Sequence, residues 1–67
     1  MSWTSCMKGK IIDHYGPEVE QCVDGITKDN FKDVLECMAG VLQVADPVEW
    51  VAEQMTNFTE WSLECAF

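Results

Sequence analysis

The sequence has no Arg, a single His and no run of about eighteen apolar residues, and these absences exclude several classes of protein. A helix that crosses a membrane needs about twenty apolar residues in succession, so we expect no insertion into a membrane. A Gly-rich phosphate-binding loop is also absent. Catalysis by a Cys–His pair would need a free cysteine beside His14. We therefore expect no enzymatic activity, no bound metal and no cofactor.

Basic residues are scarce, and their distribution is uneven. The formal net charge is −8, and all four Lys lie in residues 1–32. Residues 33–67 carry seven acidic residues and no base. This field opposes binding to nucleic acid or to anionic lipid. It favours a partner protein with a basic surface, or a small cationic or apolar ligand, unless the charge only keeps a small protein in solution.

The sequence does contain enough apolar material for one packed domain. Hydrophobic residues make up 48% of the chain, more than a disordered segment carries. A chain of this length buries only about 60% of its unfolded surface and usually needs disulfides, a metal or a second subunit. We predict a single domain over residues 1–67, and a second copy of the chain is one candidate partner.

Four cysteines are the most direct candidates for the missing stability: Cys6, Cys22, Cys37 and Cys65. Zinc ligands usually occur in pairs separated by about two to four residues, whereas these cysteines are at least fifteen positions apart. An even cysteine count in a short chain favours two disulfides in an oxidising compartment. The alternative is a cytosolic protein with four reduced cysteines that pack as small hydrophobic residues.

This cysteine content predicts a secreted, extracellular protein, with a cytoplasmic location as the alternative. Residues 1–16 mix Lys, Asp, His and Gly and lack the apolar segment of a signal peptide. We therefore expect that any leader has been removed before residue 1, and that Met1 is not a residue of the native mature chain.

Helical periodicity dominates the first half of the chain. A first helix is predicted between a cap at Ser2 or Thr4 and a stop at Gly16-Pro17. Its apolar face consists of Trp3, Cys6, Met7, Ile11 and Tyr15. A short second helix is expected to begin at Pro17, which suits the first position of a helix, and to end before Gly25.

A third helix, capped by Thr27 or Asp29, has the strongest amphipathic pattern. Its apolar positions are Phe31, Val34, Leu35, Met38, Val41 and Leu42. Gly40 lies within this pattern, and we expect it to allow the close approach of a neighbouring helix or a bend.

A fourth helix is predicted over residues 47–65. Asp46 is its expected cap, Pro47 occupies its first position and Glu49 completes a capping box. A break near residues 57–59 would divide this segment in two, but we favour one long helix. The predicted fold is therefore all-α: a small disulfide-stapled bundle of four short helices, or of five if the last segment is broken.

Helix geometry favours one of the three disulfide connectivities open to four cysteines. If the third and fourth helices are antiparallel, Cys37 and Cys65 differ by about nine residues in their distance from the connecting turn. This offset is about 13 Å of helix, too far for a disulfide unless a kink at residues 57–59 shortens it, which is an additional assumption. Cys22 and Cys37 flank a short turn with a smaller offset. We therefore predict Cys22–Cys37 and Cys6–Cys65.

Two sets of residues in the last helix are candidates for contact with a partner or a ligand. The apolar set is Trp50, Met55, Phe58 and Trp61, with Phe67 at the end of the chain. Trp and Met are common in binding surfaces, but they also fill the cores of small folds. The acidic set is Glu49, Glu53, Glu60 and Glu64, spaced to form a solvated face or to hold a cation. In addition, Asn57 begins an Asn-Phe-Thr glycosylation motif.

Three functions remain open from the sequence. The favoured hypothesis is a secreted helical protein that acts by binding a protein target, as a signalling factor, a venom or salivary effector or an inhibitor. The second is a carrier of a small apolar ligand in a helical cavity lined by the apolar set. The third is a cytosolic acidic interaction domain with reduced cysteines.

Overall fold

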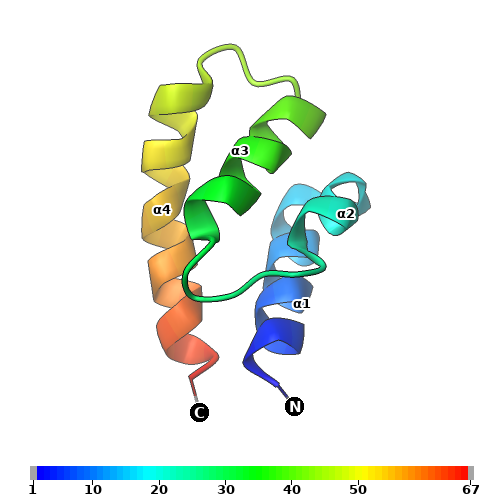
Figure 1. Ribbon diagram of the computed structural model, residues 1–67, viewed down its shortest axis with the longest axis vertical. Helices are drawn as coiled ribbons and strands as arrows, with labels where there is room; N and C mark the ends of the chain where they lie inside the picture. The colour runs from blue at the N-terminus through cyan, green and yellow to red at the C-terminus, as the bar shows by residue number, and fades with distance from the viewer. Residues whose placement is uncertain (1, 67) are drawn as a thin grey trace.

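The computed structural model describes residues 2–66, so the interpretations of Met1 and Phe67 lie outside the described residues. This range forms four α-helices and one short 3-10 helix, and contains no strand. The elements are α1 (Trp3–Tyr15), η1 (Pro17–Val19), α2 (Glu20–Val23), α3 (Phe31–Val41) and α4 (Pro47–Glu64). The predicted all-α fold is confirmed (Figure 1).

Both ends of α1 are fixed by local interactions. At its start, the Ser2 hydroxyl accepts a hydrogen bond from the backbone N–H of Ser5, over 3.1 Å. Thr4, the other cap considered, instead donates to the carbonyl of Ile26, over 3.2 Å. At its end, Gly16 has φ 98°, a left-handed conformation that favours Gly because it has no Cβ. The predicted helix and its Gly stop are confirmed.

The short second helix begins at Pro17 as predicted, but its first turn is a 3-10 helix, η1, that continues directly into α2. The single turn of α2 is too short to be stable alone, and its stability comes from tertiary contacts. Val19 and Val23 are fully buried and anchor this segment to the core.

The cap of α3 is Asn30, so the prediction of Thr27 or Asp29 was wrong. The Asn30 amide makes two hydrogen bonds within the preceding turn. Its oxygen accepts from the Thr27 N–H at 2.8 Å, and its nitrogen donates to the Gly25 carbonyl at 3.0 Å. These bonds order the turn that precedes α3, and the Asn30 side chain makes no hydrogen bond to the first turn of the helix itself. The close approach of a neighbouring helix expected at Gly40 was also wrong, because a Cβ at this position would meet no atom within 4 Å.

The last helix, α4, is continuous over its 18 residues, which confirms the preference for one long helix. The Asp46 carboxylate accepts a hydrogen bond from the backbone N–H of Glu49, over 3.2 Å, as the capping motif predicts. At the proposed break, the Thr59 hydroxyl donates to the Met55 carbonyl within the helix, over 2.8 Å. The side-chain bond is therefore accommodated without interrupting the helix.

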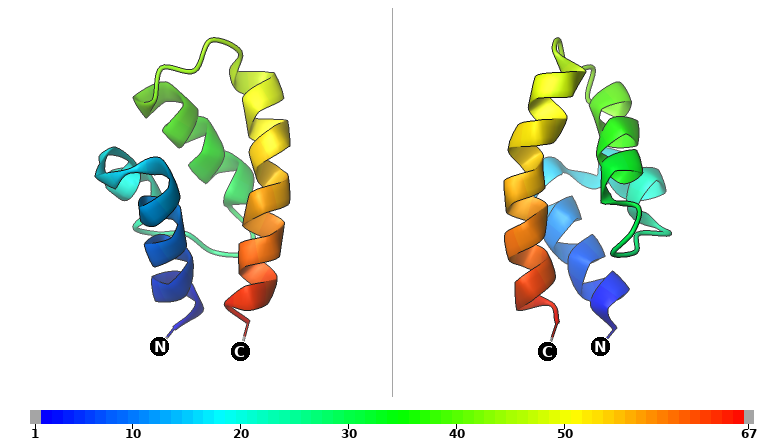
Figure 2. Two further views of the ribbon diagram at one scale, coloured as in Figure 1. Left: turned by 180° about the vertical axis from the view of Figure 1, so that it is seen from behind. Right: turned by 60° about the vertical axis from the view of Figure 1, so that its left-hand side comes forward.

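The helices pack with α1 and α3 beside α4 and antiparallel to it, so that both ends of the chain lie at the same end of the molecule (Figures 1 and 2). Their apolar faces meet in one cluster of buried side chains, which comes from every element. Its members are Met7, Ile11, Val19, Val23, Ile26, Val34, Leu35, Met38, Val51, Phe58 and Cys65.

Both predicted disulfides are confirmed. Cys6–Cys65 joins the start of α1 to the end of α4, and Cys22–Cys37 joins α2 to α3. In each pair the Cα atoms are 5.7 Å apart, within the usual range for a disulfide. The two bridges differ in their surroundings, because Cys65 is buried whereas Cys37 is exposed. No helix in residues 2–66 has both the length and the apolar composition to cross a membrane.

Candidate functional site

The apolar set predicted from the sequence does not form one surface. Phe58 is fully buried and contacts the ring of Phe31 edge to face, with centroids 5.6 Å apart. Trp61 lies beside it, at 5.8 Å between centroids. Met55 and Trp50 are half-buried against the core. These side chains therefore act mainly as packing groups in this structure, and Phe58 is closed to any ligand.

Tyr15 of α1 completes the aromatic cluster on this side of α4. Its ring lies 5.9 Å from Trp50 and 6.1 Å from Trp61, edge to face in both cases. Its hydroxyl donates a hydrogen bond to the amide oxygen of Gln54. Burial raises the pKa of the Tyr15 phenol above its ordinary value, and the nearby Asn57 amide partly opposes this effect. The α1-facing side of α4 is thus a packed interface within the fold.

The acidic set remains on the surface of α4, but its four members are not equivalent. Glu64 forms an ion pair with Lys10 of α1, over 2.9 Å. Glu49, Glu53 and Glu60 form no ion pair with any residue of the range 2–66. These three residues are exposed, and we call them the α4 acidic row.

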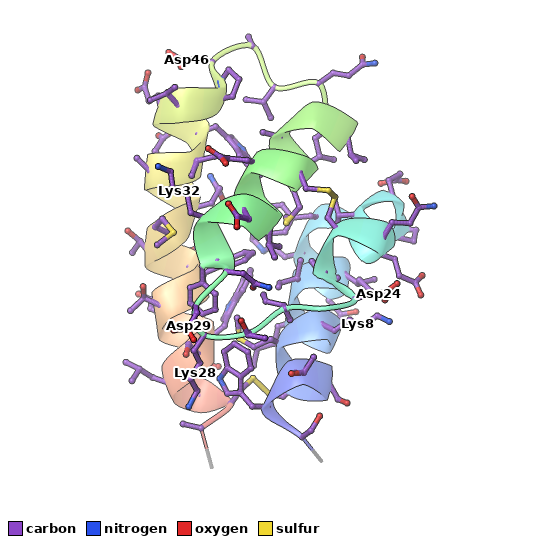
Figure 3. All side chains as sticks on the ribbon, in the orientation of Figure 1. Lys8, Asp24, Lys28, Asp29, Lys32 and Asp46 are labelled. Atoms are coloured by element: carbon purple, nitrogen blue, oxygen red, sulfur yellow. A yellow bond between two sulfur atoms is a disulfide. The ribbon has the colours of Figure 1, made fainter. Side chains whose placement is uncertain are left out.

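None of the ion pairs formed by the lysines of residues 2–66 involves the α4 acidic row. Lys8 forms ion pairs with Asp24 at 2.6 Å and with Glu20 at 3.6 Å, and Figure 3 shows Lys8 and Asp24 close together. The pKa of Lys8 is raised, mainly by its hydrogen bond to Asp24. Lys28 lies over the ring of Trp3, 5.7 Å from its centroid. The part of the chain that the structure describes therefore provides no neutralising cation for the α4 acidic row.

A second feature of α4 was missed by the sequence analysis. At about 100° per residue, four exposed residues fall within a sector of about 60° next to the acidic row. They are Val48, Ala52, Thr59 and Leu63, and we call them the α4 stripe. Val48 is 83% exposed and Leu63 is 66% exposed. The helical spacing of these four residues is visible in the sequence. The pattern of core residues on the same helix, such as Val51 and Phe58, is stronger and obscured it.

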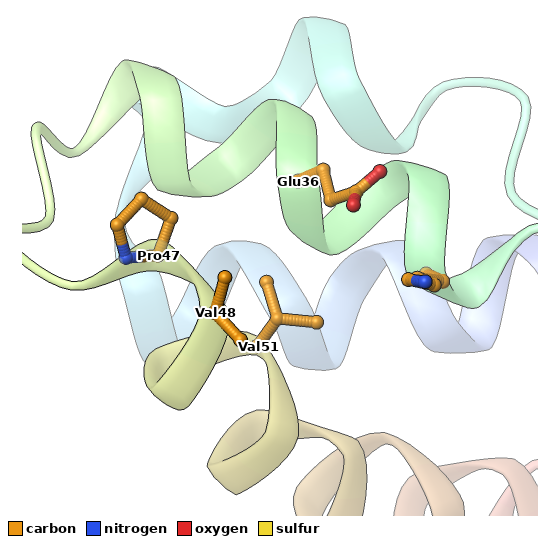
Figure 4. Close-up of a pocket in the computed structure, with 5 residues that line it drawn as sticks. Glu36, Pro47, Val48 and Val51 are labelled. Carbon is orange, nitrogen blue, oxygen red and sulfur yellow. The ribbon is translucent and has the colours of Figure 1, made fainter.

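A hollow adjoins the start of the α4 stripe, between α3 and α4. It has a volume of about 170 Å³ and is lined by Lys32, Glu36, Pro47, Val48 and Val51. Figure 4 shows Val48 and Val51 below it, with Glu36 on the opposite helix. Its lining is mainly apolar, and Lys32 forms no ion pair within residues 2–66. We call this feature the α3–α4 hollow.

A second and more open hollow lies where α1 meets the C-terminal half of α4. It has a volume of about 270 Å³ and is lined by Lys10, Asp13, His14 and Trp61. The ring of His14 contacts Trp61, with centroids 5.3 Å apart. Lys10 is held by Glu64. Neither hollow is lined by Trp50, Met55 or Phe58.

The remaining candidate residues offer little reactive chemistry. All four cysteines are bridged, so none is a free thiol. Within residues 2–66, no group of three His, Cys, Asp or Glu side chains is placed to hold a metal ion. Asn57 is half-buried in the middle of α4, and its amide donates to Gln54 over 3.3 Å.

Comparison of the whole chain with models of protein families, with curated proteins and with solved structures gave no match. The surface of α4 therefore has to be interpreted from its own chemistry.

Proposed function

We propose that this chain is an extracellular, disulfide-stabilised protein that acts by binding a partner protein with a basic surface. The two disulfides support the location, because such bridges persist in oxidising compartments and are rare in the cytosol. The observation that carries the binding function is the exposed face of α4, where an apolar stripe lies beside three acids that have no neutralising partner within residues 2–66.

The two parts of this face have different roles in binding. Val48 and Leu63 are exposed apolar side chains. Their burial against a partner makes the free energy of binding more favourable. The α4 acidic row attracts a basic partner and selects against acidic ones, because like charges placed opposite each other are costly. Protein interfaces commonly combine an apolar centre with a polar rim in this way.

The carrier hypothesis has less support from the geometry. A pocket for a small ligand usually has a volume of about 300 Å³ or more and encloses most of the ligand. Both hollows are smaller, at about 170 Å³ and about 270 Å³, and the larger one is the more open to solvent. The aromatic residues expected to line a cavity are packed against each other around Tyr15 and Phe58.

Charge reversal of the α4 acidic row tests the proposal. The variant E49K/E53K/E60K and a control, E18K/D29K/D33K, change the net charge by the same amount. The control residues are exposed and lie outside α4. Binding to a panel of purified basic extracellular proteins is measured by surface plasmon resonance at several salt concentrations.

We expect at least one member of the panel to bind the wild-type chain and the control about ten-fold or more tightly than the α4 variant. The difference should shrink as the salt concentration rises, because exposed charges are screened. Equal loss of binding in both variants would mean that only the net charge matters, and would contradict a role for this face. Absence of any binding by the wild-type chain across the panel would also contradict the proposal.

A further inference from the structure

The α3–α4 hollow has the size of a single side chain. An engineered cavity of about 150 Å³ in another protein holds one benzene molecule, which is close to the volume of about 170 Å³ found here. Its apolar walls come from Pro47, Val48 and Val51. Val51 is only 8% exposed and lies at the boundary of the core, whereas Val48 is 83% exposed and lies at the rim of the hollow. A Phe or Leu side chain of a partner would cover both valines.

The hollow, the α4 stripe and the α4 acidic row follow one another around the helix. Val48 belongs to both the hollow and the stripe, so the two are continuous. From Val48 to Leu63 the stripe extends about 22 Å along the axis, at about 1.5 Å per residue. A straight stripe of this length, with large apolar side chains at its two ends, small ones between them and charge along one edge, matches the face of one amphipathic helix.

The charges favour a basic partner helix over an antiparallel second copy of α4. Two copies of α4 packed antiparallel through their stripes would place both acidic rows along the same edge of the pair. Each copy has its acidic row on the same side of its stripe. The three acids of one copy would therefore lie beside the three acids of the other, without a cation between them. A helix with Lys or Arg along one edge would instead neutralise Glu49, Glu53 and Glu60.

We propose that the α3–α4 hollow is an anchor site for one large apolar side chain of an amphipathic helix with a basic edge, which lies along the α4 stripe. This inference rests on the proposed function and identifies its partner class. In binding interfaces a few anchor residues seated in pockets contribute most of the affinity, and the surrounding contacts exclude water. The hollow supplies the pocket, and the stripe and the acidic row supply the surroundings.

The test uses synthetic helical peptides of about 16 residues, a length that covers the stripe. Each peptide has Leu along one face, Lys along one edge of that face and a fluorescent label. One end of the Leu face carries Phe in the anchor peptides and Ala in the matched control peptides. The Phe is placed at the N-terminal end in one peptide and at the C-terminal end in another, so that both helix directions are tested. A scrambled peptide controls for charge alone.

Three forms of the oxidised chain are titrated by fluorescence anisotropy: the wild type, V48W and L63W. Both substituted residues are largely exposed, so the fold is expected to tolerate Trp at either position. The Trp at position 48 fills the rim of the hollow, whereas the Trp at position 63 lies at the other end of the stripe. Circular dichroism and the intact mass confirm that each variant is folded and bridged.

We expect one anchor peptide to bind the wild type about ten-fold or more tightly than its Ala control. In V48W this preference should fall to about two-fold or less, and in L63W it should remain. A preference for Phe that is unchanged in V48W would overturn the anchor site. So would binding of the scrambled peptide as tight as that of the anchor peptide.

Failure of the anchor site and failure of the proposed function give different results. If only the anchor is wrong, Phe and Ala peptides bind equally and both are weakened by E49K/E53K/E60K. If the proposed function is wrong, this charge reversal has no effect on the peptides or on the panel of basic proteins. Sedimentation equilibrium of the chain alone tests whether a second copy occupies the stripe. A dimer that dissociates in L63K would assign the stripe to a second copy and overturn the proposal.

Discussion

Cys6 and Cys65 are 59 positions apart in the sequence, and their Cα atoms lie 5.7 Å apart in the fold. The bridge between them fixes the first turn of α1 against the end of α4. Lys10 and Glu64 form an ion pair between the same two helices, over 2.9 Å. The covalent bond, rather than the partly exposed ion pair, provides most of the constraint at this end of the molecule, since exposed ion pairs contribute little.

The two disulfides should differ in their effect on stability. Replacing Cys6 and Cys65 by Ala is expected to lower the free energy of unfolding by about 4 kcal/mol, and replacing Cys22 and Cys37 by about 3 kcal/mol, because the first bridge closes the longer loop in the unfolded chain. Urea unfolding monitored by circular dichroism measures both values. A smaller loss for the Cys6–Cys65 variant would contradict the loop-length argument.

The two disulfides should also differ in their order of reduction. A thiolate reaches the exposed Cys37 more readily than the buried Cys65, so Cys22–Cys37 is expected to be reduced first under mild dithiothreitol. Timed alkylation followed by peptide mapping identifies which thiols appear. Before reduction, the intact mass should be lower by about four hydrogens than that of the reduced chain. Four thiols that alkylate without reductant would contradict both the bridges and the extracellular location.

Phe58 and Leu63 provide a matched comparison of core and surface on one helix. Phe58→Ala should lower the free energy of unfolding by about 3 to 5 kcal/mol, because Phe58 is fully buried against Phe31 and Trp61. Leu63→Ala should change it by about 0.5 kcal/mol or less, because Leu63 is 66% exposed. Chemical denaturation measures both. A large effect at Leu63 would show that the α4 stripe is covered in the free protein.

Tyr15 can be titrated alone, because it is the single tyrosine of the chain. Burial raises the pKa of its phenol above the ordinary value of 10.0, so the folded chain holds this proton more tightly than the unfolded chain. Its contribution to stability is therefore complete below pH 10.0 and is lost as the pH rises through the folded pKa. Phenolate absorbance should give an apparent pKa above 10.0 in the native chain, falling toward that value in urea with reductant. Equal values in both states would contradict the burial of Tyr15.

The folded protein should carry no glycan at Asn57. The side chain is half-buried, its amide is bound to Gln54, and the next residue of the motif, Phe58, is fully buried. A glycan would be attached to the Asn57 nitrogen that donates to Gln54, the same residue that accepts from Tyr15. The mass of protein secreted from eukaryotic cells, before and after treatment with peptide N-glycosidase, checks this expectation. A shift in mass on treatment would contradict it.

Much of the fold could be predicted from the sequence because its determinants are local. The cap at Asp46 and the stop at Gly16 depend on side chains and backbone conformations within a few residues. The disulfide pairing followed from helix rise and from the positions of the turns. The cap of α3 was predicted wrongly because several residues of the turn at 27–30 can cap a helix. The helix begins after Asn30, whose amide bonds to Thr27 and Gly25 in the preceding turn.

The candidate site was less predictable because it depends on what each helix face meets. By itself, the sequence determined an acidic, helical chain with two bridges, since charge, periodicity and cysteine spacing are properties of the chain alone. Only the tertiary structure decided that Phe58 and Trp61 pack within the fold, that Glu64 pairs with Lys10 while Glu60 has no ion pair among residues 2–66, and that Val48 borders a hollow. These outcomes depend on how α1 and α3 lie against α4, and contacts between distant segments are set by the packing of the whole core rather than by any local pattern.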